Sequence, residues 1–142
     1  MPPTTPIKPA LALLLILPFL PACASSQHAT GTTTFTRTTN GVNVEVLLDE
    51  YKIHMPTAIP GGEVTFDIKN TGGHRHSFEI NGQGVDAKLA HDLDPGQSAK
   101  LHVTLAPGTY KVTCPVGPHA AMGMRLKLTV APDKSVSPSS HN

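Results

Sequence analysis

The chain lacks most of the features on which a helical or a nucleic-acid-binding protein depends. Its 142 residues include no tryptophan and only 4% aromatic residues, and 11 basic against 10 acidic side chains leave a formal charge of +1. No basic run and no alternation of basic with aromatic residues occurs, which argues against nucleic acid as a partner. Fourteen prolines and twelve glycines instead favour a compact β protein rich in turns.

Long hydrophobic runs are also missing. The apolar run at residues 10–20 follows a single positive charge, Lys8, and is shorter than the ~20 residues that a membrane-spanning helix needs. It is typical of a secretory signal. The run ends in Leu20-Pro21-Ala22-Cys23, which resembles a bacterial lipobox. We therefore expect residues 1–22 to be a lipoprotein signal peptide and Cys23 to carry the lipid anchor, on a protein facing the periplasm or the cell exterior. Ordinary cleavage beside Cys23, giving a soluble periplasmic protein, is the alternative.

Cysteine is scarce. The chain has two, and in an oxidising compartment a thiol normally finds a partner. If Cys23 is lipidated or leaves with the signal, Cys114 stands alone. Metal ligation would explain a solitary thiol, whereas the plainer reading is a small buried hydrophobic residue.

Composition divides the chain into four parts. Residues 23–40 are rich in Thr, Ser and Gly and are predicted to form a flexible tether. Residues 132–142, with two prolines and several serines, are predicted to be a disordered tail. Residues 41–131 remain as the folded domain.

Within that domain apolar residues recur with a period of two, which indicates half-buried strands. Pro-Gly pairs at 60–61, 95–96 and 107–108 separate the runs. About seven to eight short strands of this kind predict an all-β fold, an antiparallel sandwich or barrel. The segment around residues 85–91 is predicted to be the only short helix. The alternating runs lie at 42–48, 64–68, 76–80, 101–105, 110–114 and 126–130.

The residues that carry chemistry lie near the C-terminus. Cys114, His119 and Met124 are spaced Cys-x4-His-x4-Met, and His76 begins an apolar stretch upstream. One thiolate, two imidazoles and a weak thioether are the ligand set of a blue-copper electron-transfer site. Strand parity points His76, Cys114 and Met124 inward, while His119 lies on the loop beyond Pro118.

Other residues compete for these roles. His74 shares the nominal face of His76, and Met122 lies beside Met124. Parity favours Met124, which leaves Met122 as part of an apolar surface around His119. Zinc could occupy the same Cys and His ligands, but it would give no visible colour. A second cysteine in the ligand loop and further histidine pairs are missing, so a binuclear or multicopper site is not expected.

The domain resembles a small cupredoxin, and its ligand loop is most similar to the rusticyanin and sulfocyanin type. The resemblance rests on residues 62–66, 70–72, 76–78, 105–110 and 114–124. It implies a Greek-key β-sandwich and one mononuclear type 1 copper held by His76, Cys114, His119 and Met124.

The same resemblance implies supporting residues and a role. The residue after the first histidine, Ser77, would donate its backbone N–H to the cysteine sulfur, and Asn70 would support the site from outside the ligand set. We expect a monomeric one-electron carrier between redox partner proteins, with no enzymatic turnover. A copper-binding or delivery protein without fast redox cycling is the alternative.

Overall fold

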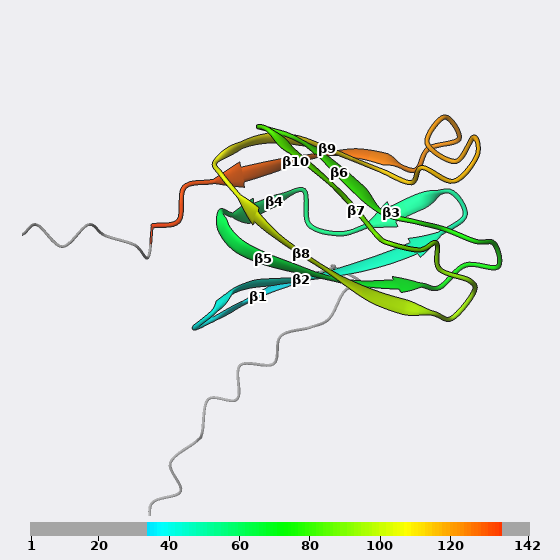
Figure 1. Cartoon of the computed structure of the whole chain (residues 1–142), viewed down its shortest axis with the longest axis horizontal. Coiled ribbons are helices and arrows are strands. Elements are labelled where there is room, and N and C mark those ends of the chain that lie inside the picture. The colour runs from blue at the N-terminus through cyan, green and yellow to red at the C-terminus, as the bar shows by residue number, and fades with distance from the viewer. Residues whose placement is uncertain (1–33, 135–142) are drawn as a thin grey trace, which may run out of the picture.

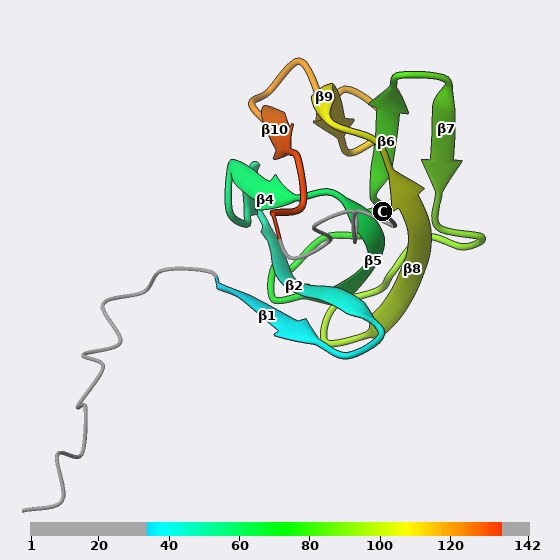
Figure 2. The same cartoon turned by 90° about the vertical axis from the view of Figure 1, so that its left-hand side faces the viewer.

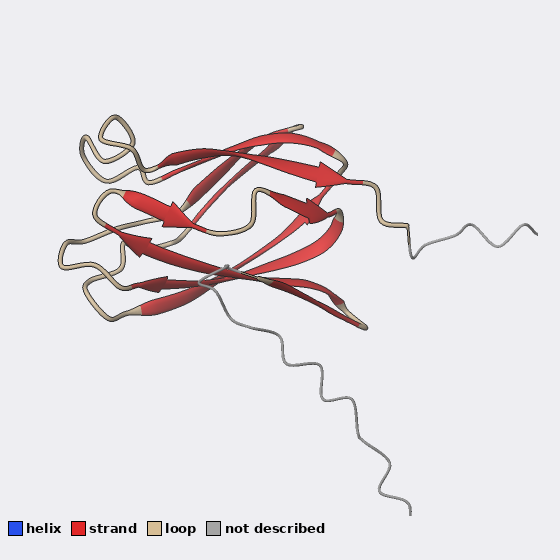
Figure 3. Cartoon of the chain, turned by 180° about the vertical axis from the view of Figure 1, so that it is seen from behind, coloured by secondary structure: helices blue, strands red, loops and turns tan. Residues whose placement is uncertain are grey.

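The domain is a sandwich of two five-stranded sheets. The structure is a computed structural model, and it describes residues 34–134. The two sheets face one another as separate layers (Figure 2). Strands and loops make up the described part of the chain, which contains no helix (Figure 3). The predicted all-β sandwich is therefore confirmed, with ten strands in place of the expected seven or eight.

After β3 the chain crosses several times between the two sheets (Figure 1). In the first sheet the order is β1-β2-β5-β8, and β3 also pairs with β2. In the second sheet the order is β4-β10-β9-β6-β7. The first sheet comprises β1 (Phe35–Thr38), β2 (Gly41–Asp49), β3 (Lys52–His54), β5 (Gly62–Asn70) and β8 (Ser98–Leu105). The second comprises β4 (Ala58–Pro60), β6 (Glu79–Gly82), β7 (Val85–Lys88), β9 (Gly108–Thr113) and β10 (Arg125–Ala131).

The alternating apolar residues form the core between the layers. On β2 and β5 every second side chain is buried, and the rings of Phe66 and Phe78 meet across the layers at 5.2 Å between centroids. On β9, Tyr110 and Val112 are buried and Lys111 is exposed. Each large side chain buried in this way contributes about 1.5–3 kcal/mol. Strand parity therefore decides which residues enter the sandwich.

Two strand pairs of the sandwich differ from the predicted antiparallel arrangement. Strands β2 and β5 are parallel, as are β4 and β10. Between β2 and β5 the chain passes through β4, which belongs to the other sheet. That crossover brings β5 back beside β2 in the same direction. A period of two reports which face of a strand is buried, but it does not report the strand's neighbour.

The predicted helix around residues 85–91 is also wrong. Val85–Lys88 is strand β7, which pairs with β6 in a hairpin. The two connecting residues, Gln83 and Gly84, have φ values of 50° and 80°. Positive φ at both central positions is the turn that matches the twist of two antiparallel strands. This turn redirects the chain into a second strand and so prevents a helix.

The predicted tether contains ordered residues near its end. Phe35–Thr38 forms β1, although all four of its side chains are exposed, because its backbone pairs with β2. Arg37 also forms an ion pair of 2.6 Å with Asp133, beyond β10. Backbone pairing requires no apolar periodicity, so the composition of this segment did not reveal the strand. Residues 1–33 and 135–142, and with them the signal, most of the tether and most of the tail, lie outside the described residues.

Candidate metal centre

Cys114 and Met124, two of the predicted ligands, lie at the two ends of the loop between β9 and β10. The backbone N–H of Cys114 donates to the carbonyl of Met124 at 3.0 Å, and Met124 N–H donates to the carbonyl of His119 at 3.0 Å. Cys114 and Met124 therefore continue the pairing of the two strands by one step. Both are completely buried. The loop lies at the same end of the molecule as the turn between β2 and β3 (Figure 1).

His76 comes from the segment before β6, which is held in place by pairing with Leu93. Its backbone forms a two-bond bridge with Leu93, with His76 N to Leu93 O at 3.0 Å and Leu93 N to His76 O at 2.7 Å. The next residue, Ser77, donates its backbone N–H to the sulfur of Cys114 at 3.3 Å. The hydrogen bond that the family resemblance implied for Ser77 is thus present.

Three of the predicted ligands converge. Ligand atoms of His76, Cys114 and His119 all lie within 4.8 Å of one another. The two Nδ1 atoms are 3.2 Å apart, and the Cys114 sulfur lies 3.7 Å from Nδ1 of His119. Both imidazoles therefore present the same ring nitrogen to one point. His76 and Cys114 are buried and His119 is partly exposed.

The competing residues take different positions. Met124 is buried, and its backbone forms hydrogen bonds with Cys114 and His119, two of the clustered residues. Met122, in contrast, is 50% exposed. The His74 side chain is 68% exposed and contacts Glu50 instead of joining the cluster. His76 and not His74 therefore joins the cluster. Met124 as the fourth ligand stays a prediction, and Met122 lies on the surface.

Asn70 holds the segment before His76. Its side-chain amide donates to the carbonyls of His74 and Leu93 at 2.8 and 2.9 Å, and its oxygen accepts the N–H of Gly72 at 2.9 Å. The residue is completely buried. Asn70 therefore ties the segment before His76 to Leu93, the residue that pairs with His76.

Burial shifts the pKa values of Cys114 and His119 in opposite directions. It raises the pKa of the Cys114 thiol above its ordinary value, and the N–H of Ser77 only partly opposes this by stabilising the thiolate. It lowers the pKa of His119, with the neighbouring His76 adding to the effect. Burial therefore favours a neutral thiol and a neutral imidazole, and a metal held by Cys114 would displace the thiol proton.

Two residues of the centre were not predicted. Glu50 follows β2 and its Oε1 lies 3.4 Å from Nε2 of His76. The rings of Tyr51 and His119 form a T-shaped pair with 5.1 Å between their centroids. Hydrogen bonds from His74 and Gly73 lower the pKa of Glu50 to about 2, so this carboxyl group is ionised at neutral pH. No local pattern marks Glu50, because only the fold brings residue 50 to residue 76.

Comparison with known proteins identifies the family. The profile of the cupredoxin-like domain matches residues 11–130, most of the chain. The chain belongs to the cupredoxin-like domain family. No curated protein sequence matches it. This family and the His-Cys-His cluster together fit one type 1 copper.

Solved cupredoxin structures share the fold. A dithionite-reduced auracyanin from Roseiflexus castenholzii is 25% identical, with a TM-score of 0.55, covering 63% of this chain and 97% of that one. Rusticyanin variants are 23% identical at a TM-score of 0.53, covering 71% and 88%. A multicopper oxidase is 21% identical at a TM-score of 0.52, and the match covers 71% of this chain but only 47% of the oxidase chain. The expected cupredoxin sandwich is therefore confirmed.

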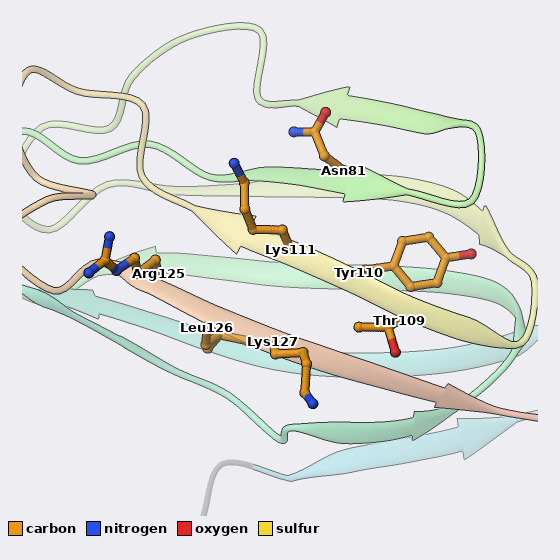
Figure 4. Close-up of a pocket in the computed structure, with 7 residues that line it drawn as sticks. All are labelled: Asn81, Thr109, Tyr110, Lys111, Arg125, Leu126 and Lys127. Atoms are coloured by element: carbon orange, nitrogen blue, oxygen red, sulfur yellow. The ribbon is translucent and has the colours of Figure 1, made fainter.

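A separate depression lies on the outer face of the second sheet. Its volume is about 590 Å³, and its lining includes Lys111, Arg125 and Lys127 from β9 and β10 (Figure 4). Lys111 and Lys127 are directly opposite each other in the strand register. None of the clustered ligands lines it, so it is not part of the metal centre.

Proposed function

We propose that this protein is a one-electron carrier that holds a single type 1 copper through His76, Cys114 and His119, with Met124 as the weak axial ligand. The observation that carries the proposal is the convergence of two Nδ1 atoms and one sulfur within 4.8 Å at the end of a cupredoxin sandwich. Bound copper supplies a centre that takes up and releases one electron.

The protein's own residues keep the ligand atoms in place. The Ser77 N–H stabilises negative charge on the Cys114 sulfur, and Asn70 anchors the approach to His76. Because these hydrogen bonds come from the fold of the chain itself, little rearrangement is needed when the charge at the centre changes. A site that hardly moves loses little driving force to reorganisation, which suits a carrier.

Electrons exchange with redox partner proteins through the exposed side of His119. That histidine is partly exposed, and Met122 beside it is a large apolar side chain that is 50% exposed. An apolar rim around the ligand gives a partner a surface that it can desolvate. The proposed role is electron transfer without enzymatic turnover.

The proposal extends to the location of the protein. Cys23, which lies outside the described residues, would carry a lipid that holds the domain at a membrane surface, facing the periplasm or the cell exterior. Residues 34–134 contain no helix that could cross a membrane. Mass spectrometry of the mature N-terminus tests this: an acylated Cys23 supports the anchor, and a free N-terminus at another residue contradicts it.

Colour tests the copper site directly. Addition of Cu(II) is expected to produce an intense visible band, because a thiolate bound to Cu(II) absorbs strongly, whereas zinc gives no band. Cys114→Ser is expected to abolish the band, and Met124→Leu to keep it with an altered reduction potential. The matched control Met122→Leu should change neither. A Cys114→Ser variant with an unchanged spectrum would contradict the assignment.

Kinetics separate a carrier from a delivery protein. Rapid electron self-exchange between oxidised and reduced protein is expected for a carrier. Ready loss of Cu(I) to a competing chelator, together with slow self-exchange, would instead favour copper delivery.

A further inference from the structure

A carboxylate lies directly behind the His76 ring. Glu50 Oε1 is 3.4 Å from His76 Nε2, while Nδ1 of the same ring lies 3.2 Å from Nδ1 of His119. The ring therefore has one nitrogen facing the cluster and the other facing the carboxylate. His76 is completely buried, whereas the Glu50 side chain is 29% exposed, so Glu50 lies between the buried ring and solvent.

The loop before His76 holds this carboxylate in position. Backbone N–H groups of Gly73 and His74 each donate to Glu50 Oε1 at 2.7 Å, and Nδ1 of His74 lies 3.1 Å from it. Hydrogen bonds to a carboxylate are shorter and stronger than those between neutral groups. Glu50 is therefore fixed relative to the same loop that delivers His76.

We propose that Glu50 is a positioning residue for His76, accepting its Nε2–H and placing a negative charge behind the ring. A neutral imidazole has one N–H, so a proton kept on Nε2 leaves the lone pair of Nδ1 free for a metal. A carboxylate that accepts the Nε2–H also makes Nδ1 a stronger electron-pair donor to a metal. Building on the proposed copper function, the added negative charge favours the oxidised ion over the reduced one and lowers the reduction potential.

Two variants separate the charge of Glu50 from its position. Glu50→Gln keeps an oxygen acceptor for the loop and the ring but removes the charge. Gly72→Ala keeps the charge and displaces it, because a Cβ at residue 72 would lie 2.6 Å from Glu50 Oε1 and 2.8 Å from Oε2. The tip of a flexible side chain can yield, so this variant should fold. Glu45→Gln is the matched control, since Glu45 is exposed on β2 and forms no ion pair with a described residue.

The first measurement needs no metal. Nitrogen-15 NMR of the metal-free protein should find His76 as the Nε2–H tautomer in the unmodified chain, in Glu45→Gln and in Glu50→Gln. Gly72→Ala should give a mixture of tautomers. If His76 carries its proton on Nδ1 in the unmodified chain, or if Gly72→Ala leaves the tautomer unchanged, the positioning role is overturned.

The second measurement is the reduction potential of the copper-loaded protein. Both Glu50→Gln and Gly72→Ala should raise the potential, and Glu45→Gln should not. Losing such a partner weakens metal binding by about 10–100-fold, and each tenfold loss confined to the oxidised form raises a one-electron potential by about 59 mV. An unchanged potential in Glu50→Gln overturns the charge effect. If the unmodified chain gives no coloured copper form, the proposed function fails, while the metal-free NMR still decides the role of Glu50.

Discussion

Residues that are not themselves predicted ligands form hydrogen bonds that support the metal centre at the end of the sandwich. Asn70 is buried and satisfies three backbone groups, and Ser77 N–H meets the Cys114 sulfur. A buried donor or acceptor that loses its partner costs about 1–3 kcal/mol. The centre is therefore sensitive to residues that never contact a metal.

Replacing Asn70 tests this sensitivity. Asn70→Ala is expected to lower the free energy of unfolding by about 1–3 kcal/mol, because the carbonyl of His74 loses the amide donor and that of Leu93 keeps only the N–H of His76. Urea denaturation of the metal-free protein measures the change. Asn43→Ala on the exposed face of β2 is the control and should stay within about 0.5 kcal/mol. Equal stabilities of the two variants would contradict the role given to Asn70.

The Cys114 thiol also predicts how metal binding depends on pH. Its pKa is raised by burial and that of His119 is lowered, so the proton that competes with the metal belongs to the thiol. Below the thiol pKa, the apparent affinity for zinc should fall by about tenfold per pH unit, because one proton is displaced per metal bound. Competition titrations with a chelator between neutral and alkaline pH measure this slope. A flat profile would show that the thiolate is not a ligand.

Among the strands, β9 and β10 connect the centre to the rest of the fold. Their register runs from Gly108 opposite Val130 to Thr113 opposite Arg125, and Cys114 and Met124 follow at its end. On the outer face the same register places Lys111 opposite Lys127, with Arg125 nearby (Figure 4). Like charges directly opposite one another destabilise a strand pair.

Reversing one of these charges should stabilise the strand pair. Lys127→Glu is expected to raise the free energy of unfolding by about 0.2–1 kcal/mol at low salt, since repulsion becomes a cross-strand attraction. The gain should shrink in high salt because exposed charges are screened. Lys69→Glu, whose partner across the strands is Ser98, is the control and should gain nothing. Thermal unfolding at two ionic strengths provides the comparison.

At the scale of the whole molecule, the centre joins segments that are far apart in the chain. His76 arrives from the segment before β6, Cys114 and His119 from the β9–β10 loop, and Glu50 from the end of β2. A metal that binds His76, Cys114 and His119 together binds only the folded chain. Metal binding should therefore stabilise the entire domain.

Zinc offers a test of this coupling without redox chemistry. At a free zinc concentration about a thousandfold above Kd, the domain is expected to gain about 4 kcal/mol, which raises Tm by several degrees for each kcal/mol. Calorimetry with and without zinc measures the gain. Cys114→Ser should lose most of it, and a gain that persists in this variant would place the zinc elsewhere.

Local patterns in the sequence were sufficient for the core and for the ligand types. Alternation identified the buried faces of β2, β5 and β9, and the spacing of Cys114, His119 and Met124 predicted a metal loop. These features depend on side chains that are neighbours along one strand or one loop. The information is therefore contained in short stretches of chain.

Only the tertiary structure decided which strands pair and what stands behind each ligand. The strand at residues 85–88, the parallel pairing of β2 with β5, and the contact between Glu50 and His76 were all invisible in local patterns. Each depends on a turn or a crossover that joins distant segments. Periodicity shows which side of a strand faces the core. Which strand pairs with it, and which residues meet it at the metal centre, depends on the packing of the whole chain.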